Sequence, residues 1–225
     1  MSVKEVPNSV IKRLPKYLRA IDKLISRDME MASSQLLSKE TGNSPEQIRK
    51  DLAYFGTFGT KGSGYKIQLL RKKLLKILGL QNPNPNKVVV VGAGNLGKAL
   101  ARYTEKNNPY VELAGIFDKN PQTVGTYVLQ HKIKHISELP HLVNHENVKI
   151  SILAVPPAEA EGAVNFLAEN GIIAVLKLTP ASITVPEGIY IQDVDINLEL
   201  QSLMYHVFDN DEELSLENIN LAGKL

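Results

Sequence analysis

The sequence contains no cysteine, no tryptophan and no apolar run long enough to cross a membrane. Without cysteine the chain forms no disulfide bond and carries no thiolate chemistry. A membrane helix needs about 18 consecutive apolar residues. A secretory signal peptide needs an apolar centre, and residues 1–20 have none. These absences fit the reducing cytosol, and we expect a cytoplasmic protein.

Metal-binding patterns are also lacking. Four of the five histidines fall between residues 131 and 145, and their spacing matches no zinc-binding pattern. The surrounding residues are polar, so we expect these histidines in a loop or a surface helix, and we expect no metal site. The four are His131, His135, His141 and His145.

Charge is unevenly distributed along the chain. Residues 1–80 contain 16 lysines and arginines against 7 acidic residues, a net charge of +9. Residues 81–225 contain 10 against 17, a net charge of −7. The overall value of +2 therefore conceals a basic N-terminal segment. This asymmetry is compatible with a segment that meets a polyanion, and equally with one that is only solvated.

The chain is organised around a glycine-rich turn. Four consecutive valines, Val88–Val91, predict a strand buried on both faces. Gly92, Gly94 and Gly97 follow with G-x-G-x-x-G spacing, and residues 98–103 predict a helix. The first glycine permits a tight bend, the second lets the backbone approach a pyrophosphate, and the third lets helix and strand pack closely. The helix N-terminus then offers free N–H groups to phosphates.

A second strand, residues 111–117, ends in Asp118. A carboxylate at this position accepts hydrogen bonds from both adenosine ribose hydroxyls and favours NAD over NADP, whose ribose carries a 2′-phosphate. Asp118 comes 21 residues after Gly97, close to the expected spacing of about 20. Lys119 follows directly and slightly weakens this discrimination.

Strands and helices continue to alternate, which predicts a parallel sheet. The strand over residues 148–155 ends in Val155 and Pro156, and its carboxyl end is expected in the ligand crevice beside the glycine-rich turn. A helix over residues 158–170 and a strand over residues 172–178 follow. The fold class is therefore α/β with a Rossmann-like parallel sheet.

The basic segment contains a helix-turn-helix pattern. A helix over residues 35–40 ends at a turn, residues 41–43, and Ser44 begins the next helix. Ser44 can cap that helix, Pro45 suits its first position, and Gln47 completes an S-x-x-Q capping box. In helix-turn-helix proteins the second helix lies in the DNA major groove.

The predicted second helix presents polar side chains to its surroundings. Ile48 and Leu52 share one face and point to the core, which leaves Gln47, Arg49 and Lys50 facing outward. These three side chains are candidates for DNA contact.

A longer amphipathic helix precedes this motif, with apolar residues recurring between residues 10 and 25. Its basic residues, among them Arg13, Lys16 and Arg19, lie largely off the apolar face. Because proline lacks a backbone donor, we expect the regular helix to begin or kink at Pro15.

Four glycines lie between residues 56 and 65, and they predict a hairpin with Lys61 near its tip. Such a wing enters the minor groove or lies along phosphates, although a plain β-turn would also fit. The amphipathic helix, the helix-turn-helix, the wing and the local charge together favour DNA binding.

Prolines and asparagines over residues 82–86 mark a domain boundary. Beyond the sheet, a final helix, residues 198–207, carries an apolar stripe that needs a partner surface, either its own domain or a second subunit. We expect a winged-helix DNA-binding domain over residues 1–82, a Rossmann NAD(H)-binding domain over 86–193, a dimerisation helix within 194–210 and an acidic tail over 211–225.

Taken together, these features resemble the Rex family of redox-sensing transcriptional repressors, and the resemblance covers nearly the whole chain. The string Gln47–Gly56 (QIRKDLAYFG), followed by the wing, is highly specific, whereas the glycine-rich turn adds little alone. The other stretches that carry the resemblance are Arg13–Arg19, Gly62–Tyr65, Val91–Gly97, Phe117–Asp118 and Val194–Asp195.

The resemblance implies a homodimer that binds palindromic operators and represses genes of fermentation and NADH reoxidation. In such proteins NADH releases the DNA, whereas NAD+ competes and permits DNA binding. It also implies that the last helix is swapped onto the partner subunit. Arg19 would couple the first helix to Tyr103 and to Asp195 of the partner subunit. Some members place an aromatic residue directly after this aspartate; here it is Ile196.

These arguments give three groups of candidate residues. The cofactor-binding group is Val91, Gly92, Ala93, Gly94, Asn95, Leu96, Gly97, Tyr103, Asp118, Lys119, Val155 and Pro156. The DNA-binding group is Arg13, Lys16, Ser44, Gln47, Arg49, Lys50, Lys61 and Gly62. The coupling group is Arg19, Tyr103 and Asp195. NAD(H) is expected as effector, without catalysis.

Two alternatives remain. One is an NAD-dependent oxidoreductase with a basic appendage. Such an enzyme needs a proton donor or acceptor beside its substrate, and the crevice edges at residues 155–157 and 179–181 provide none. The other is a regulator that senses a different nucleotide such as coenzyme A, since the same turn accepts either.

Overall fold

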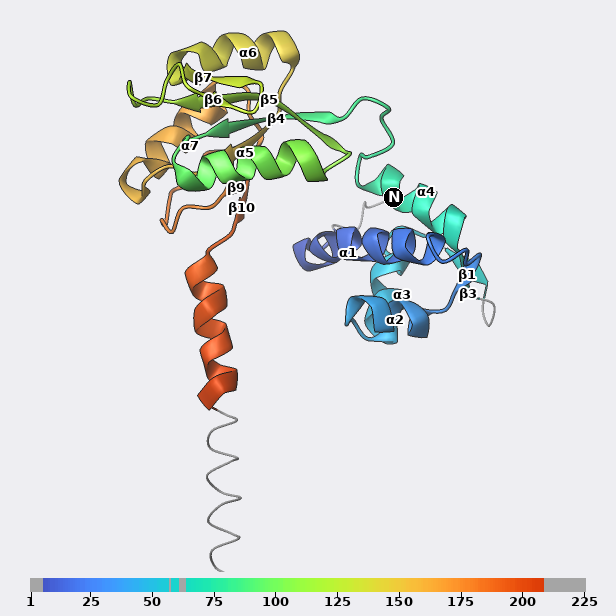
Figure 1. The fold of residues 1–225 in the computed structure, drawn as a ribbon. Helices are drawn as coiled ribbons and strands as arrows, with labels where there is room; N and C mark the ends of the chain where they lie inside the picture. Colours follow the sequence, from blue (N-terminus) through green and yellow to red (C-terminus); the bar gives the residue numbers. More distant parts are fainter. Residues whose placement is uncertain (1–5, 57, 61–63, 209–225) are drawn as a thin grey trace, which may run out of the picture. The chain divides into compact units, whose positions relative to one another are not determined.

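The computed structural model describes residues 6–56, 58–60 and 64–208. The chain divides into two compact units, Met1–Asn84 and Pro85–Leu225 (Figure 1). Lys61, Gly62 and the predicted acidic tail over residues 211–225 lie outside the described residues. Among the helices that the structure describes, none is long and apolar enough to cross a membrane.

The first unit combines four helices, which share one apolar core, with a small antiparallel sheet of order β1-β3-β2. The predicted hairpin is confirmed as β2 paired with β3, and β1 adds a strand that the sequence pattern did not predict. Gly64 has a φ of +76°, and a Cβ there would lie 2.6 Å from the carbonyl oxygen of Ala32, so β3 needs glycine where it passes β1. The elements are α1 (Asn8–Ile25), β1 (Met31–Ala32), α2 (Ser34–Thr41), α3 (Pro45–Ala53), β2 (Gly59–Thr60), β3 (Gly64–Lys66) and α4 (Ile67–Ile77).

α1 includes Pro15 in its interior, so the regular helix does not begin there, and the alternative of a kink at Pro15 stays a prediction. An interior proline costs a helix about 3 kcal/mol. The face of α1 that carries Leu14, Tyr17, Ile21 and Leu24 is buried in the core of this unit, and each large side chain contributes about 1.5–3 kcal/mol on burial. Packing therefore outweighs the lost backbone hydrogen bond.

The helix-turn-helix forms as predicted, with one difference. Ser33 caps α2, Gly42 ends it in the left-handed conformation with a φ of 73°, and Ser44 caps α3 by accepting from the Gln47 backbone N–H. The predicted capping box is only half formed, because the Gln47 side chain donates to Asp51 instead of returning to Ser44. Gln47 is therefore half-buried and does not face outward.

The second unit is a doubly wound sheet of order β10-β9-β8-β4-β5-β7-β6, in which every pairing is parallel except β6 with β7. The strands are β4 (Asn86–Val91), β5 (Val111–Asp118), β6 (Tyr127–Val128), β7 (His131–His135), β8 (Ile150–Leu153), β9 (Ala174–Lys177) and β10 (Tyr190–Asp193). The helices are α5 (Asn95–Asn107), α6 (Leu139–Glu146) and α7 (Ala160–Glu169), with 3₁₀ turns η1 (Ile136–Glu138) and η2 (Pro157–Glu159).

Both faces of the sheet are covered, as the run of valines predicts. Val88 and Val90 pack in one core with Ala101 of α5, whereas Val89 and Val91 pack in another core with residues of α6 and α7. Alternate residues of β4 therefore enter opposite cores. Strand order reverses around β4, so the carboxyl ends of β4, β5 and β8 lie where ligands bind in doubly wound sheets.

The prediction that His131 and His135 lie in a loop or surface helix is wrong. Both belong to β7, which extends the sheet beside β5 and turns back from β6. Only Ile133 and Val128 of this short hairpin are fully buried apolar residues, so its pattern was too weak to predict a strand. Among the described residues, no group of three or more histidine, aspartate or glutamate side chains is arranged to hold a metal ion.

The predicted C-terminal helix is confirmed over residues 196–208. Asp195 caps it, because its Oδ1 accepts from the Asn197 backbone N–H at 2.9 Å. Every described side chain of this helix is exposed. Its large exposed apolar residues are Ile196, Leu198, Leu200, Leu203, Met204, Tyr205, Val207 and Phe208.

Candidate nucleotide cleft and DNA-binding surface

A cleft of about 1050 Å³ opens at the carboxyl ends of β4, β5 and β8. That volume lies at the upper end of the range for small-molecule and cofactor sites. Its walls are mainly apolar. The lining residues are Val91, Gly92, Gly94, Asn95, Leu96, Asp118, Lys119, Asn120, Pro121, Thr123, Ile136, Ala154, Val155, Pro156, Glu159, Gly162, Ala163 and Phe166.

Two glycines of the turn are required by the fold itself. Gly92 has a φ of +93°, and a Cβ there would overlap the carbonyl oxygen of Ala154. A Cβ on Gly97 would overlap the carbonyl oxygen of Gly92. The turn therefore passes too close to the neighbouring backbone for any side chain at either position.

Gly94 is different, because the fold alone does not require glycine there. Its φ of −68° is open to any residue, and no described heavy atom lies within 4 Å of where a Cβ would stand. Gly94 also lines the cleft. A missing side chain in open space beside a cleft is what a closely approaching pyrophosphate requires.

α5 begins at this point and directs its N-terminus to the cleft. Gly94 is its N-cap, and the first intrahelical bond runs from the Lys98 N–H to the Gly94 carbonyl. The N–H groups of Asn95, Leu96 and Gly97 thus have no acceptor within the helix. Asn95 and Leu96 line the cleft, so the helix end can bind an anion there.

Asp118 is oriented by the backbone on both of its carboxylate oxygens. Oδ2 accepts from the Ala93 N–H at 2.7 Å, and Oδ1 accepts from the Asn120 N–H at 2.8 Å. The side chain is half-buried in the cleft wall. A carboxylate oxygen has a second lone pair, so each can still accept a bond from a ribose hydroxyl.

Lys119 makes an ion pair with Glu159, with Nζ 2.9 Å from Oε1. Lys119 follows β5, whereas Glu159 follows β8, and both residues line the cleft. Since β4 separates these two strands in the sheet, the ion pair joins the two sides of the cleft.

Most of the predicted cofactor residues come together in this cleft. Of the twelve, nine line it and three do not. Ala93 is buried and gives its N–H to Asp118, Gly97 is buried at the start of α5, and the Tyr103 side chain is 65% exposed further along α5.

Sequence reasoning missed the other half of the lining. Asn120 and Pro121 directly follow the predicted acidic position and could have been included on that ground. Glu159, Ala163 and Phe166 lie beyond a strand end on η2 and α7, and only the orientation of that helix brings them to the cleft.

A buried lysine supports the wall beside Val155. The Lys177 side chain is only 2% exposed, and its ammonium donates to the carbonyls of Thr179 and Ala181 and pairs with Asp193 at 2.9 Å. The Thr179 hydroxyl in turn donates to the Val155 carbonyl at 2.6 Å. These bonds link the cleft wall to the segment that enters the C-terminal helix.

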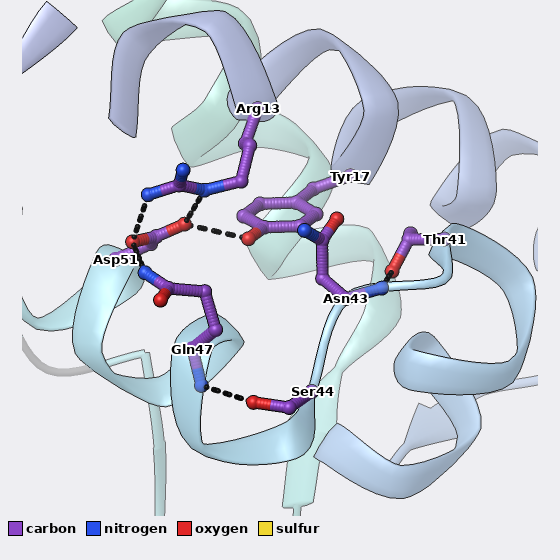
Figure 2. A network of polar contacts seen from close by, with 7 residues as sticks. All are labelled: Arg13, Tyr17, Thr41, Asn43, Ser44, Gln47 and Asp51. Carbon is purple, nitrogen blue, oxygen red and sulfur yellow. Dashed lines mark hydrogen bonds and ion pairs between the residues drawn. The ribbon is translucent and has the colours of Figure 1, made fainter. Parts of the chain in front are cut away.

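In the first unit, a polar network joins α1 to α3 (Figure 2). The buried Asp51 carboxylate accepts two hydrogen bonds from Arg13, at 2.6 and 2.9 Å, and one from the Tyr17 hydroxyl at 2.6 Å. The Gln47 amide donates a further bond at 2.6 Å. Figure 2 shows all three donors converging on this one carboxylate. The second helix of the motif is therefore held against α1 by a fixed set of bonds.

The network keeps Asp51 ionised. Burial by itself raises the pKa of the Asp51 carboxyl, but the hydrogen bonds from Arg13, Tyr17 and Gln47 outweigh that effect. Its pKa therefore lies below the ordinary value of 3.8. Burial and the bond to Asp51 raise the pKa of the Tyr17 phenol, so Tyr17 remains a donor.

The other predicted DNA-binding residues fall into three situations. Lys16 and Lys50 are exposed on α1 and α3. Arg49 is exposed and donates to Ser34 and Glu46. Ser44 uses its hydroxyl as the cap of α3.

The predicted coupling residues belong to different elements. Arg19 is exposed on α1, and among the described residues no hydrogen bond or ion pair involves its side chain. Tyr103 is exposed on α5. Asp195 is half-buried as the cap of the C-terminal helix.

Comparison with known proteins gives the same two-part organisation. The family model "Putative DNA-binding protein N-terminus" matches residues 5–53, and "CoA binding domain" matches residues 83–181. The chain is 45% identical over 215 residues to the redox-sensing transcriptional repressor Rex of Natranaerobius thermophilus, covering 96% of this chain and 97% of that protein. It is 38% identical over 202 residues to Rex of Caldicellulosiruptor saccharolyticus, covering 90% and 91%.

Solved structures agree. The crystal structure of RSP, a Rex-family repressor, matches with a TM-score of 0.81 and 33% identity, covering 94% of this chain and 97% of that one. RSP in complex with β-NAD+ and operator DNA matches with a TM-score of 0.83 and 32% identity, covering 96% and 98%. RSP in complex with β-NADH matches with 0.79 and 32%, covering 93% and 96%. With an N-terminal helix-turn-helix, a nucleotide cleft in a doubly wound sheet and these relatives, the chain belongs to the Rex family of redox-sensing transcriptional repressors.

Proposed function

We propose that this protein is a transcriptional repressor that binds palindromic operator DNA as a homodimer and releases it when NADH occupies the cleft. The observation that carries the ligand assignment is Gly94, whose missing side chain leaves open space at the cleft and at the N-terminus of α5. Asp118 supplies the ribose acceptor on the adjacent wall. RSP, the relative described above, has been solved with both β-NADH and β-NAD+.

The apolar wall of the cleft favours the reduced cofactor. The oxidised nicotinamide ring is cationic and the reduced ring is neutral, so only the oxidised ring loses charge hydration on entering an apolar environment. Val155 and Pro156 form part of this wall. We therefore expect NADH to bind more tightly than NAD+.

The ligand acts as an effector, without undergoing a reaction. Among the described lining residues, the charged ones are Asp118, Lys119 and Glu159. Asp118 serves the ribose, and Lys119 and Glu159 are paired with each other. This leaves no charged group for proton transfer to a substrate beside the nicotinamide.

DNA contact is assigned to α3 and the wing. Lys50 and Arg49 on α3, together with Lys16 on α1, supply exposed positive charge for the major groove and its phosphates. Arg13 and Gln47 direct their side chains to Asp51, so their principal role in this proposal is to fix the position of α3.

The C-terminal helix is assigned to the dimer interface. Its exposed apolar side chains need a partner surface, and a second copy of this chain would supply two recognition helices for the two half-sites of a palindrome. Half-sites in successive major grooves lie about 34 Å apart. In the proposed switch, Arg19 bonds to Tyr103 and to Asp195 of the partner subunit in one state and loses these bonds in the other, and NADH shifts the balance between the two states.

Coenzyme A is the second ligand to test, because the family model over residues 83–181 is described as a CoA binding domain. Its ribose carries a 3′-phosphate, which the Asp118 carboxylate would repel. The carboxylate thus favours a ribose with two free hydroxyls.

Replacing Gly94→Ala tests this function. A Cβ in the open space would displace the pyrophosphate, and we expect at least a tenfold loss of NADH affinity, about 1.4 kcal/mol, by calorimetric titration. Thermal stability and binding to DNA should remain unchanged, because no described atom contacts the added methyl group. The variant should then keep DNA bound at NADH concentrations that release it from the unmodified protein. Unchanged NADH affinity would exclude this turn as the pyrophosphate site.

A further inference from the structure

The ion pair between Lys119 and Glu159 is relevant to a second property of the cleft, its selectivity between NADH and NADPH. These cofactors differ only in the 2′-phosphate on the adenosine ribose. Proteins that accept NADPH supply a cation beside that phosphate. This question rests on the proposed NADH-binding function.

Lys119 is the one cation among the described residues that line the cleft. It directly follows Asp118, the residue assigned to the ribose, so it stands where a 2′-phosphate would need a partner. An unpaired lysine directly after Asp118 would therefore be expected to allow NADPH to bind.

Lys119 is not free, because Glu159 holds its ammonium at 2.9 Å from the opposite side of the cleft. For Lys119 to bind a phosphate, it would have to leave Glu159. The Glu159 carboxylate would then stand unpaired beside the phosphate, and so would that of Asp118. The three charged lining residues carry a net charge of −1, which opposes any additional anion at this end of the cleft.

We propose that Glu159 is a specificity-determining residue, which excludes NADPH by holding Lys119 away from the 2′-phosphate. In the proposed complex, the Asp118 carboxylate accepts hydrogen bonds from the free ribose hydroxyls. Glu159 pairs with Lys119, the cation that could otherwise neutralise a 2′-phosphate. The preference for NADH therefore depends on unfavourable interactions with NADPH as much as on favourable contacts with NADH.

The test compares affinities for NADH and NADPH in the unmodified protein and in Glu159→Gln. Glutamine keeps the length and the hydrogen-bonding oxygen but removes the charge, so Lys119 becomes available. We expect the preference for NADH over NADPH to narrow by about tenfold, through a gain in NADPH affinity. AMP and adenosine 2′,5′-bisphosphate, which differ only in the 2′-phosphate, should show the same narrowing when they are titrated in the same way.

Two further variants separate the proposed mechanism from a general charge effect. The double variant Lys119→Met, Glu159→Gln should return to the original preference, because the gain requires the freed lysine. Glu161→Gln is the matched control, since Glu161 is exposed, bonds to the Thr184 N–H and does not line the cleft. It should leave the preference unchanged.

An unchanged preference in Glu159→Gln would overturn the proposal. So would a gain that survives loss of Lys119, or an equal gain in Glu161→Gln. The comparison of AMP with adenosine 2′,5′-bisphosphate reports on the ribose end alone. It would therefore still decide the role of Glu159 if the protein failed to bind NADH, the result that would refute the proposed function instead.

Discussion

At the scale of single residues, two buried charges organise the two units. Asp51 accepts hydrogen bonds from Arg13, Tyr17 and Gln47 and thereby holds α3 against α1. Lys177 distributes its three N–H donors among two carbonyls and Asp193. Each charge is tolerable in the interior because its hydrogen-bonding capacity is used.

Replacing Asp51→Asn should destabilise the DNA-binding unit by about 2–4 kcal/mol. An asparagine removes the charge that pairs with Arg13 and points N–H donors at other donors. Urea unfolding of the full chain measures the change. Glu46→Gln on the exposed side of the same helix is the control, and should change stability by less than about 0.5 kcal/mol.

The stability that Asp51 contributes should depend on pH in a defined way. Because the folded pKa of Asp51 lies below its ordinary value of 3.8, its contribution to stability is fully present above that value. It is lost as the pH falls through the folded pKa. The difference in unfolding free energy between the unmodified protein and Asp51→Asn should therefore be constant between roughly pH 6 and 8 and shrink only in strong acid. A difference that shrank near neutral pH would contradict the assignment.

At the scale of elements, the helix over residues 196–208 differs from the other described helices, because all of its described side chains are exposed. Its large apolar side chains are exposed, and an apolar surface of this kind marks a site of association. The start of this helix is fixed by polar contacts. Asp195 caps it, and Lys177 holds the preceding segment through Asp193.

If this helix forms the proposed dimer interface, Leu203→Glu should give a monomer, because a charge would enter that apolar interface. Size-exclusion chromatography with light scattering measures the mass. Gln201→Glu adds the same charge at a polar position of the same helix and should remain dimeric. A dimer of unchanged stability in Leu203→Glu would exclude this helix as the interface.

Elements with strong local signals could be predicted from the sequence. Ser44 and Pro45 place the start of α3, and the valines before Gly92 place β4. The β6–β7 hairpin could not be predicted, because its strands are short and mostly polar. Pro15 suggested a later start of α1, but the helix begins at Asn8 because its apolar face is packed in the core on both sides of the proline.

The site was predictable where one residue type carries the chemistry. Gly92, Gly94 and Asp118 follow from their positions at strand ends. Interactions between distant residues could not be read in this way. A charged residue such as Asp51 is usually exposed on an amphipathic helix. Here it is buried and paired with Arg13, which lies 38 positions earlier in the chain. Lys119 finds its partner in Glu159, forty positions along the chain, only because β5 and β8 flank β4.

At the scale of the whole molecule, the protein combines a DNA-reading unit, a nucleotide cleft and an unpartnered helix in one chain. In the proposed dimer, the ligand can shift the equilibrium between DNA-binding and released arrangements only by binding one of them more tightly. A 100-fold difference in affinity corresponds to about 2.7 kcal/mol. That is within reach of a few charge-assisted hydrogen bonds, such as those proposed for Arg19.

Titrating nucleotides into the protein bound to DNA tests most directly whether NADH binding releases the DNA. The probe is a fluorescent duplex carrying an inverted repeat, selected by this protein from a random-sequence pool, and anisotropy reports its release. The account predicts that NADH weakens DNA binding by about 100-fold, and that NAD+ leaves the complex intact and competes with NADH. NADPH and coenzyme A should have no effect at the same concentrations. Equal release by all four nucleotides, or release by none, would contradict it.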